Sequence, residues 1–219
     1  MKVDLRVYAL LDPAVAGGHK LADLAKMIAP STTLVQLRDK HGTTRAMVEE
    51  ARALVAVLRP AGIPVLVNDR VDVALAAGAD GVHVGQDDMA VADARRLLGP
   101  EAIIGLSIKT AAQAEAAPLD LLTYAAIGGV FATTSKDNTA APIGLDGLRR
   151  IVAVIRARSA RYPVCAIAGI NNNNAGNIID AGADGAAIIS ALSLAHDPAQ
   201  AAGRLRGVVD DALHRRATL

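Results

Sequence analysis

VALAAGADGVHVG (residues 73–85) and NIIDAGADGAAIIS (residues 177–190) share one pattern: a helical run, a closing Gly, an Asp-Gly turn and an apolar run of strand length. The shared AGADG is suited to end a helix on a left-handed Gly and to lead directly into the next strand. One copy lies in each half of the chain. This repeat indicates a fold built from two similar halves.

The repeat sits within a longer alternation of strands and helices. Segments such as TTRAMVEEARALVAVLRPAG carry apolar residues at helical spacing between short apolar runs. Alternation of this kind predicts a parallel sheet, and strands that are apolar throughout predict burial on both faces. The eight predicted strands are residues 6–12, 33–38, 64–68, 81–85, 102–107, 121–128, 163–169 and 185–190.

In this count the repeated segments supply strands four and eight, the matching strands of two half-barrels. We therefore predict an α/β fold, a (β/α)8 TIM barrel that forms a single domain over residues 1–219. The alternative is an open doubly wound sheet. It lacks sequence support, because IAGINNNNAG has the wrong glycine spacing for a dinucleotide-binding turn.

The composition excludes several classes of function. The 23 basic and 22 acidic residues nearly cancel, so we expect no nucleic-acid partner and no membrane partner. Aromatic residues make up 2% of the chain, which leaves few platforms for stacking on bases. The N-terminus lacks the features of a signal peptide, and no apolar run has spanning length. We expect a soluble, cytoplasmic protein in which the lone Cys165 is an inert buried thiol.

Polar residues follow most of the predicted strands. In a (β/α)8 barrel, chemistry lies at the carboxyl ends of the strands, so these residues are expected to meet on one rim. In strand order, the residues at these strand ends are Arg38, Asp39, Lys40, Asn68, Asp69, Gln86, Asp87, Asp88, Ser107, Thr133, Ser135, Lys136, Gly169 and Ser190.

The chemistry of this rim suits two anions and one metal ion. Arg38, Lys40 and Lys136 supply donors and positive charge for a phosphate or diphosphate. Mg²⁺ is typically bound by one or two carboxylates together with substrate phosphate oxygens, a role open to Asp69 and Asp88. The last two strands of such barrels often bind another phosphate on backbone N–H groups. The pattern predicts a Mg²⁺-diphosphate site beside a second phosphate site.

Simpler interpretations of the acidic residues stay open. Asn68 or Asp69 could cap the predicted helix RVDVALAAG, and Asp87 or Asp88 could cap MAVADARRLLG. Asp87 fits the cap position better than a metal-binding role. The sequence alone does not choose between caps and metal ligands for the remaining residues.

Other polar residues also have structural interpretations. Arg38 and Lys40 alone could form a solvated charge cluster, and His83, inside an apolar strand, is expected to be a core histidine with its hydrogen bonds satisfied. Asp80 and Asp184 are interpreted as turn residues. The joint pattern along the rim, more than any single residue, favours a binding site.

The order of the motifs resembles that of thiamine phosphate synthases. VQLRDK, VNDRVDVALAAGADGVHVGQDD, IIGLS, GGVFATTSKD, IAGI and AAIIS occur in the order seen in that family, from about Tyr8 to Leu192. The resemblance implies a transferase of thiamine biosynthesis. Such an enzyme displaces pyrophosphate from 4-amino-2-methyl-5-hydroxymethylpyrimidine diphosphate with the nitrogen of a thiazole phosphate.

The resemblance also implies a role for each matching residue. Arg38, Lys40, Ser107 and Lys136 would be catalytic, and Mg²⁺ would be bound by Asp69 and Asp88. The pyrimidine substrate would contact Gln36, Arg38, Lys40, Asn68, Ser107 and Lys136, and the thiazole phosphate would contact Thr133, Ser135, Gly169, Ile189 and Ser190. Leu37, Asp39 and Thr134 lie within the same substrate-binding segments.

The implied chemistry depends on charge neutralisation. Pyrophosphate leaves readily only when its charge is neutralised, and the thiazole nitrogen needs no deprotonation, so no general base is required. Two segments depart from the family pattern: Ser135 replaces a Thr, and TYAAIGGVFATT differs from the commoner DYIGVGPVFPTPT. One alternative is a thiazole tautomerase-like isomerase, which has no need for a Mg²⁺-diphosphate site. The other is a non-catalytic phosphate-binding barrel, in which a damaged site would be expected. The oligomeric state, including a homo-oligomer, is left open.

Overall fold

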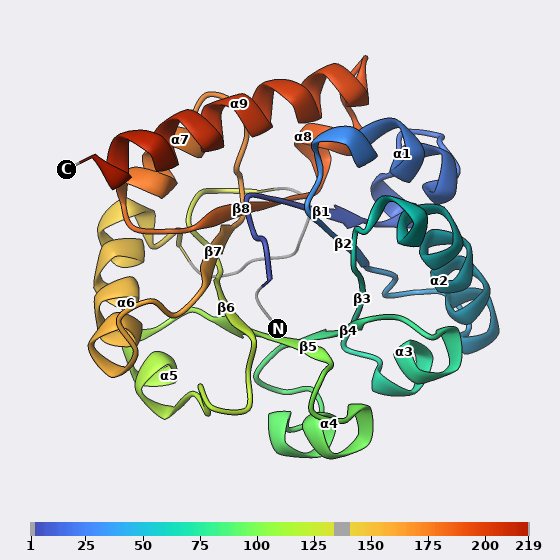
Figure 1. The fold of residues 1–219 in the computed structure, drawn as a ribbon, viewed down its shortest axis with the longest axis horizontal. Helices are drawn as coiled ribbons and strands as arrows, with labels where there is room; N and C mark the ends of the chain where they lie inside the picture. Colours follow the sequence, from blue (N-terminus) through green and yellow to red (C-terminus); the bar gives the residue numbers. More distant parts are fainter. Residues whose placement is uncertain (1–2, 134–140, 219) are drawn as a thin grey trace.

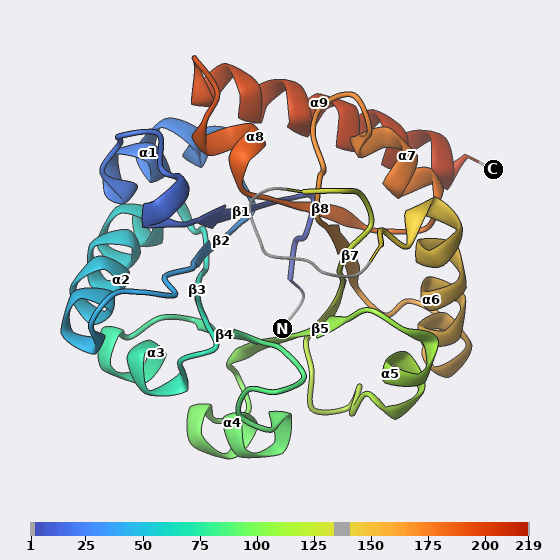
Figure 2. The ribbon, with the colours of Figure 1, turned by 180° about the vertical axis from the view of Figure 1, so that it is seen from behind.

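A computed structural model describes residues 3–133 and 141–218 of the chain. Eight parallel strands form a closed barrel in sequence order, with helices arranged around it (Figures 1 and 2). This confirms the predicted (β/α)8 barrel and excludes the open sheet. The strands are β1 (Val7–Leu11), β2 (Leu34–Leu37), β3 (Val65–Asn68), β4 (Gly81–Val84), β5 (Ile103–Ile108), β6 (Tyr124–Ile127), β7 (Val164–Ile167) and β8 (Gly185–Ile188).

The helices cover the outer face of the barrel, and the longest one, α9, crosses the side formed by β8 and β1 (Figure 1). Several begin with a side chain that accepts a backbone hydrogen bond, as Thr43 does for α2 and Asp197 for α9. The α-helices are α1 (Leu21–Ile28), α2 (Thr44–Leu58), α3 (Val71–Ala77), α4 (Val91–Leu98), α5 (Ala111–Ala116), α6 (Gly144–Arg158), α7 (Ala175–Asp180), α8 (Ser190–Ser193) and α9 (Pro198–Ala217), and the 3-10 turns are η1 (Pro13–Val15), η2 (Ala29–Ser31) and η3 (Arg59–Ala61).

The predicted helix caps at Asn68 or Asp69 and at Asp87 or Asp88 do not form, so that interpretation is wrong. Helix α3 begins after Arg70 and α4 after Ala90, and neither residue makes a side-chain cap. The chain turns earlier than a cap would allow, because Asp69 has a positive φ of 62°. Asp is one of the few residues other than Gly that adopt this left-handed conformation readily. The turn leaves the Asp69 carboxylate outside the helix and at the rim.

The amino-terminal face of the barrel repeats one contact four times. The residue that precedes each even-numbered strand accepts a side-chain hydrogen bond from an N–H at the start of the strand before it. The four bonds are Val7 N to Thr33 Oγ1 (3.1 Å), Val65 N to Asp80 Oδ2 (2.8 Å), Ile104 N to Thr123 Oγ1 (3.1 Å) and Val164 N to Asp184 Oδ2 (3.0 Å). The two halves are therefore built alike, and the turn residues Asp80 and Asp184 also join neighbouring strands.

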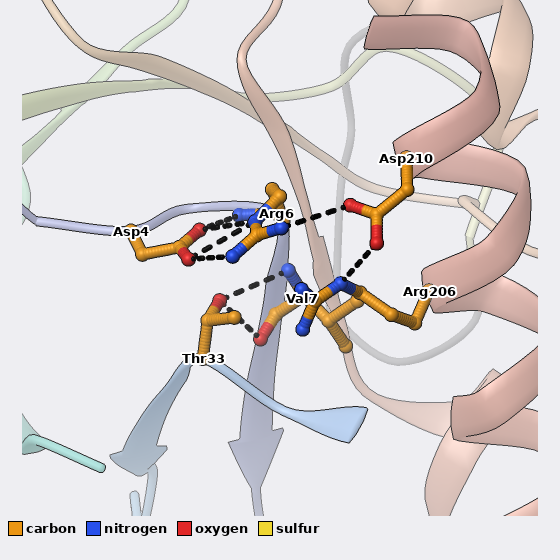
Figure 3. A network of polar contacts seen from close by, with 6 residues as sticks. All are labelled: Asp4, Arg6, Val7, Thr33, Arg206 and Asp210. Carbon is orange, nitrogen blue, oxygen red and sulfur yellow. Dashed lines mark hydrogen bonds and ion pairs between the residues drawn. The ribbon is translucent and has the colours of Figure 1, made fainter. Parts of the chain in front are cut away.

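An ionic network holds the start of β1 against the C-terminal helix (Figure 3). Arg6 pairs with Asp4 at 2.5 Å and with Asp210 at 3.1 Å, and Asp210 also accepts a hydrogen bond from Arg206 at 2.7 Å. Because Asp210 and Arg206 belong to α9, the network joins the two ends of the chain. It lies at the amino-terminal face, opposite the predicted site.

The apolar core has two layers, one between the barrel and the helices and one inside the barrel. The inner layer includes Tyr8, Tyr124 and Cys165, each almost completely buried. Burial raises the pKa of the Cys165 thiol, as expected of an inert buried cysteine. No helix in the described part of the chain has the length and apolar character needed to cross a membrane.

Candidate active site

A cavity of about 530 Å³ opens at the carboxyl ends of the strands, within the usual size range of small-molecule sites. Residues from many of the strands and from the loops that follow them meet there. Its lining residues are Tyr8, Leu10, Gln36, Arg38, Asn68, His83, Ser107, Lys109, Ala126, Gly128, Gly129, Ala132, Thr133, Ile167, Ala168, Gly169, Ile170, Asn171, Ala187, Ile188, Ile189, Ser190 and Ala191.

The cavity brings together most of the described residues that the sequence places at the site. Those that line it are Gln36, Arg38, Asn68, Ser107, Thr133, Gly169, Ile189 and Ser190. Lys40, Asp69 and Asp88 follow β2, β3 and β4 at the same end of the barrel, outside the lining. Thr134, Ser135 and Lys136 lie outside the described residues.

Two residues predicted to contact substrate, Leu37 and Asp39, do not line the cavity. Leu37 is buried in the layer between the barrel and the helices. Asp39 accepts hydrogen bonds from the N–H groups of His41 and Gly42 at 2.9 and 2.8 Å, which shapes the loop before α2. Neither side chain belongs to the cavity lining, so their roles in the structure are packing and loop formation.

Arg38 is held by an acidic residue that directly follows β1. Its guanidinium pairs with the carboxylate of Asp12, and the side chains of Arg38 and Asp12 are only 14% and 4% exposed. Asp12 also accepts a hydrogen bond from the N–H of Ala14 at 2.9 Å. With its carboxylate fixed in this way, Asp12 positions a buried cation at the edge of the cavity, where it can meet an anion.

Asp69 and Asp88 interact directly at the ends of neighbouring strands. Burial raises the pKa of Asp69, the Asp88 carboxyl raises it further, and the ion pair with Lys40 opposes them. Burial acts to raise the pKa of Asp88 as well. Hydrogen bonds from Asp69 and from the N–H of Gly85, at 2.7 Å, nevertheless lower it. Within this pair the pKa of Asp69 is therefore raised and that of Asp88 is lowered.

This carboxylate pair fits a hard divalent cation. Mg²⁺ prefers oxygen ligands and is commonly bound by only one or two carboxylates, with water and phosphate oxygens in its other positions. No third His, Cys, Asp or Glu joins the pair in residues 3–133 and 141–218. The set of donors suits an ion that also takes ligands from a substrate.

The far side of the cavity is lined by backbone. After β7, Ala168 and Gly169 both have positive φ, 93° and 66°. A side chain at Gly169 would place its Cβ 2.4 Å from the carbonyl oxygen of Ala132, so only glycine fits. Within the described residues, the N–H groups of Gly169 and Ile170 donate to no acceptor. Free amide groups beside a cavity are suited to bind an anion.

Comparisons with known proteins identify the family of the chain. A family model described as thiamine monophosphate synthase matches residues 7–192. The chain belongs to this family. It is 47% identical to a thiamine-phosphate synthase from Agrobacterium fabrum, over 98% of each chain. It is 48% identical to one from Chloroflexus aurantiacus, over 94% of each.

Solved structures give the same result. The chain is similar to a thiamine phosphate pyrophosphorylase from Pyrococcus furiosus, with a TM-score of 0.83, 36% identity, and coverage of 96% of this chain and 98% of that one. A structure titled "Native KDPGal structure" has a TM-score of 0.72 at 18% identity and shares the fold alone. As a member of this family, the chain is a transferase of thiamine biosynthesis, and the comparisons favour this over the tautomerase and the non-catalytic barrel.

Sequence reasoning missed several residues of the site. Lys109 lines the cavity because β5 continues to Ile108, one residue past the predicted end, so Ser107 and Lys109 follow each other at strand spacing. Tyr8 lies inside an apolar strand, where nothing in the sequence distinguishes the face turned into the barrel. His83 is buried with its hydrogen bonds satisfied, as predicted, and it also lines the cavity.

Proposed function

We propose that the chain joins 4-amino-2-methyl-5-hydroxymethylpyrimidine diphosphate to a thiazole phosphate and releases pyrophosphate. One observation carries this proposal: a single cavity has the Arg38 cation and a carboxylate pair near one side, and free backbone N–H groups of the β7 loop on the other. Two anion-binding regions separated by an open space suit two phosphorylated substrates that react with each other.

The pyrimidine substrate is assigned to the side of β2–β5. Gln36, Asn68 and Ser107 would contact the ring, and Arg38, Lys40 and Lys136 would bind the diphosphate. Asp69 and Asp88 would hold Mg²⁺, which supplies positive charge to the leaving group when bound. The thiazole phosphate is assigned to Thr133, Thr134, Ser135, Gly169, Ile189 and Ser190.

The residues promote the reaction by position and charge. Arg38, Lys40 and Lys136 offset the negative charge that accumulates on the departing pyrophosphate. The cavity holds the thiazole nitrogen close to the exocyclic carbon of the pyrimidine, which removes most of the entropic cost of bringing two substrates together. The nitrogen attacks through its lone pair, so no residue has to act as a general base. We assign this activity to the cytoplasm, as expected for an enzyme of small-molecule biosynthesis.

The direct test is product formation. Purified protein is mixed with both substrates, with either Mg²⁺ or EDTA, and thiamine phosphate and pyrophosphate are measured. We expect equal amounts of the two products with Mg²⁺ and none with EDTA. Absence of product with intact substrates and Mg²⁺ would contradict the proposal, and isomerisation of the thiazole phosphate alone would favour the tautomerase. Equal rates in EDTA would contradict the metal assignment.

A further inference from the structure

Five side chains form one hydrogen-bonded chain across the inside of the barrel, at the floor of the cavity. The amide nitrogen of Gln36 donates to the hydroxyl of Tyr8, whose oxygen lies 2.8 Å from the hydroxyl of Tyr124. Tyr124 lies 2.9 Å from Nδ1 of His83, and Nε2 of His83 lies 2.9 Å from Oγ of Ser107. The chain therefore connects two residues that the proposed function places against the pyrimidine ring.

The barrel is built to let this chain cross it. His83, Gly105 and Tyr124 are in register on the neighbouring strands β4, β5 and β6. A Cβ at Gly105 would lie 2.1 Å from Cζ of Tyr124 and 2.3 Å from its hydroxyl oxygen. The missing side chain on β5 is the space through which Tyr124 reaches His83. The ring of Tyr8 packs edge-on against that of Tyr124, at 5.8 Å and 88°, which fixes the other half of the crossing.

The donors and acceptors give the chain one direction. An amide NH₂ can only donate, so the Tyr8 oxygen accepts a hydrogen bond from Gln36. The Tyr8 hydroxyl then donates its own hydrogen bond to the oxygen of Tyr124. Tyr124 in turn donates to Nδ1 of His83, which leaves the imidazole proton on Nε2, facing Ser107. The Ser107 oxygen accepts a hydrogen bond from this Nε2–H, so the Ser107 hydroxyl can donate its own hydrogen to another group.

The two ends of the chain are consequently opposite in character. At one end, Oε1 of Gln36 is buried and has no hydrogen-bond partner in the described residues, although the side chain is only 1% exposed and lines the cavity. A buried acceptor without a partner is costly unless a ligand supplies a donor. At the other end, Ser107 lines the cavity as a donor.

We propose that Tyr8, Tyr124 and His83 are positioning residues that set the hydrogen-bonding polarity of the pyrimidine site. They hold Gln36 as an acceptor and Ser107 as a donor. This pair offers an acceptor to the 4-amino group of the pyrimidine and a donor to a ring nitrogen. The proposal rests on the proposed function, since it concerns how that site selects its substrate.

The protein has three tyrosines, which offer a matched set of variants. Tyr8→Phe and Tyr124→Phe each remove one hydroxyl from the chain and keep the ring. Tyr162→Phe is the control, because Tyr162 is also buried but donates to the carbonyl oxygen of Leu119, away from the cavity lining. We expect the first two variants to raise the KM for the pyrimidine diphosphate up to about tenfold and to leave the KM for the thiazole phosphate unchanged. Unchanged kinetics in both would overturn the proposal.

Substrate selectivity separates positioning from a general loss of structure. The analogue with oxygen in place of the 4-amino group presents the reversed pattern, a carbonyl acceptor beside a ring N–H donor. We expect the wild type to reject it by at least about 100-fold, because the Gln36 acceptor would face a carbonyl oxygen in place of the amino group. Tyr8→Phe removes the hydrogen bond that fixes the Gln36 amide, so the amide can rotate by half a turn. The preference for the 4-amino substrate over the 4-oxo analogue should then fall about tenfold, whereas Tyr162→Phe should leave it unchanged. A preference that stays constant in Tyr8→Phe would contradict the proposal.

The direction of the chain can be measured without turnover. Nitrogen-15 NMR of histidine-labelled protein at about pH 8, above the ordinary histidine pKa of about 6.5, reports which ring nitrogen carries the proton. The spectrum of His83→Asn assigns the His83 signals among the five histidines. We expect the proton on Nε2, and a proton on Nδ1 would overturn the stated polarity. If the wild type formed no thiamine phosphate while the proton was on Nε2, the proposed function would be contradicted, but the direction of the hydrogen bonds would still be supported.

Discussion

The Nζ atom of Lys40 contacts a carboxylate oxygen of Asp69, so a residue predicted to bind diphosphate and a residue predicted to bind metal neutralise each other at the carboxyl end of the barrel. Diphosphate and Mg²⁺ carry opposite charges, and each would take one member of this pair. Binding of a metal-diphosphate substrate would thus replace the Lys40–Asp69 ion pair with two others. Asp69 also interacts with Asp88, so the proposed metal would meet both carboxylates.

Asp69→Asn is expected to weaken Mg²⁺ dependence and turnover together. The amide keeps the size of the side chain but removes one negative charge, so the Mg²⁺ concentration needed for half-maximal rate should rise at least about tenfold. The measurement is a Mg²⁺ titration of product formation. Asp87→Asn is the matched control, since Asp87 is exposed and lies beside Asp88 outside the cavity lining. An unchanged titration in Asp69→Asn would count against metal binding by this residue.

Lys136→Ala is expected to reduce kcat by about 10²–10³ when both substrates are saturating. Lys136 lies outside the described residues, and its role follows from the family motif GGVFATTSKD. The physical reason is the loss of a cation that offsets charge on the departing pyrophosphate. Single-turnover rates would separate this effect from weaker binding. A near-normal rate would show that Arg38 and the metal suffice for departure of the leaving group.

The pH dependence of stability should reveal the network that joins the chain ends. Burial acts to raise the pKa of Asp4, but hydrogen bonds and charge from Arg6 outweigh it, and the net pKa is lowered. A lowered pKa in the folded state stabilises the protein above the unfolded value of about 3.9, and this stabilisation disappears as the pH falls through the folded pKa.

Asp4→Asn should therefore reduce the free energy of unfolding at pH 7 by less than about 1 kcal/mol, because the partly exposed pair is screened by solvent. The difference from wild type should close in acid, and urea unfolding at both pH values measures it. Asp23→Asn, which breaks the exposed pair between Asp23 and Lys26, should have little effect at either pH. A difference that persists in acid would show that Asp4 acts through packing.

The strands were predictable because a parallel barrel buries both faces of each strand, which leaves an apolar run in the sequence. The rim residues were predictable because they follow those runs. The hydrogen-bonded chain through Tyr8 and His83 was not predictable, since residues that face into and out of the barrel look alike in a continuously apolar strand. The predicted cap of α3 was wrong for a local reason. The positive φ of Asp69 moves the start of the helix, and nothing in the sequence shows that turn.

Asp80 and Asp184 lie in the same sequence motif but make different contacts, which the sequence does not show. The repeat AGADG indicates equal roles, and both carboxylates accept a hydrogen bond from the first residue of the preceding strand. Only Asp184 also pairs with two arginines, Arg156 of α6 at 2.9 Å and Arg216 of α9 at 2.7 Å.

Asp184→Ala should consequently lower the free energy of unfolding by about 3 kcal/mol, because it leaves two partly buried cations without their partner. Asp80→Ala, which loses the bond to the N–H of Val65, should cost about 1 kcal/mol. Urea unfolding of the two variants at neutral pH gives the comparison. Equal losses would mean that the arginines find other acceptors, as Arg216 already does at the carbonyl oxygens of Ile179 and Ala183. A larger loss in Asp184→Ala would show that α6 and α9 are fastened to the barrel through this one carboxylate.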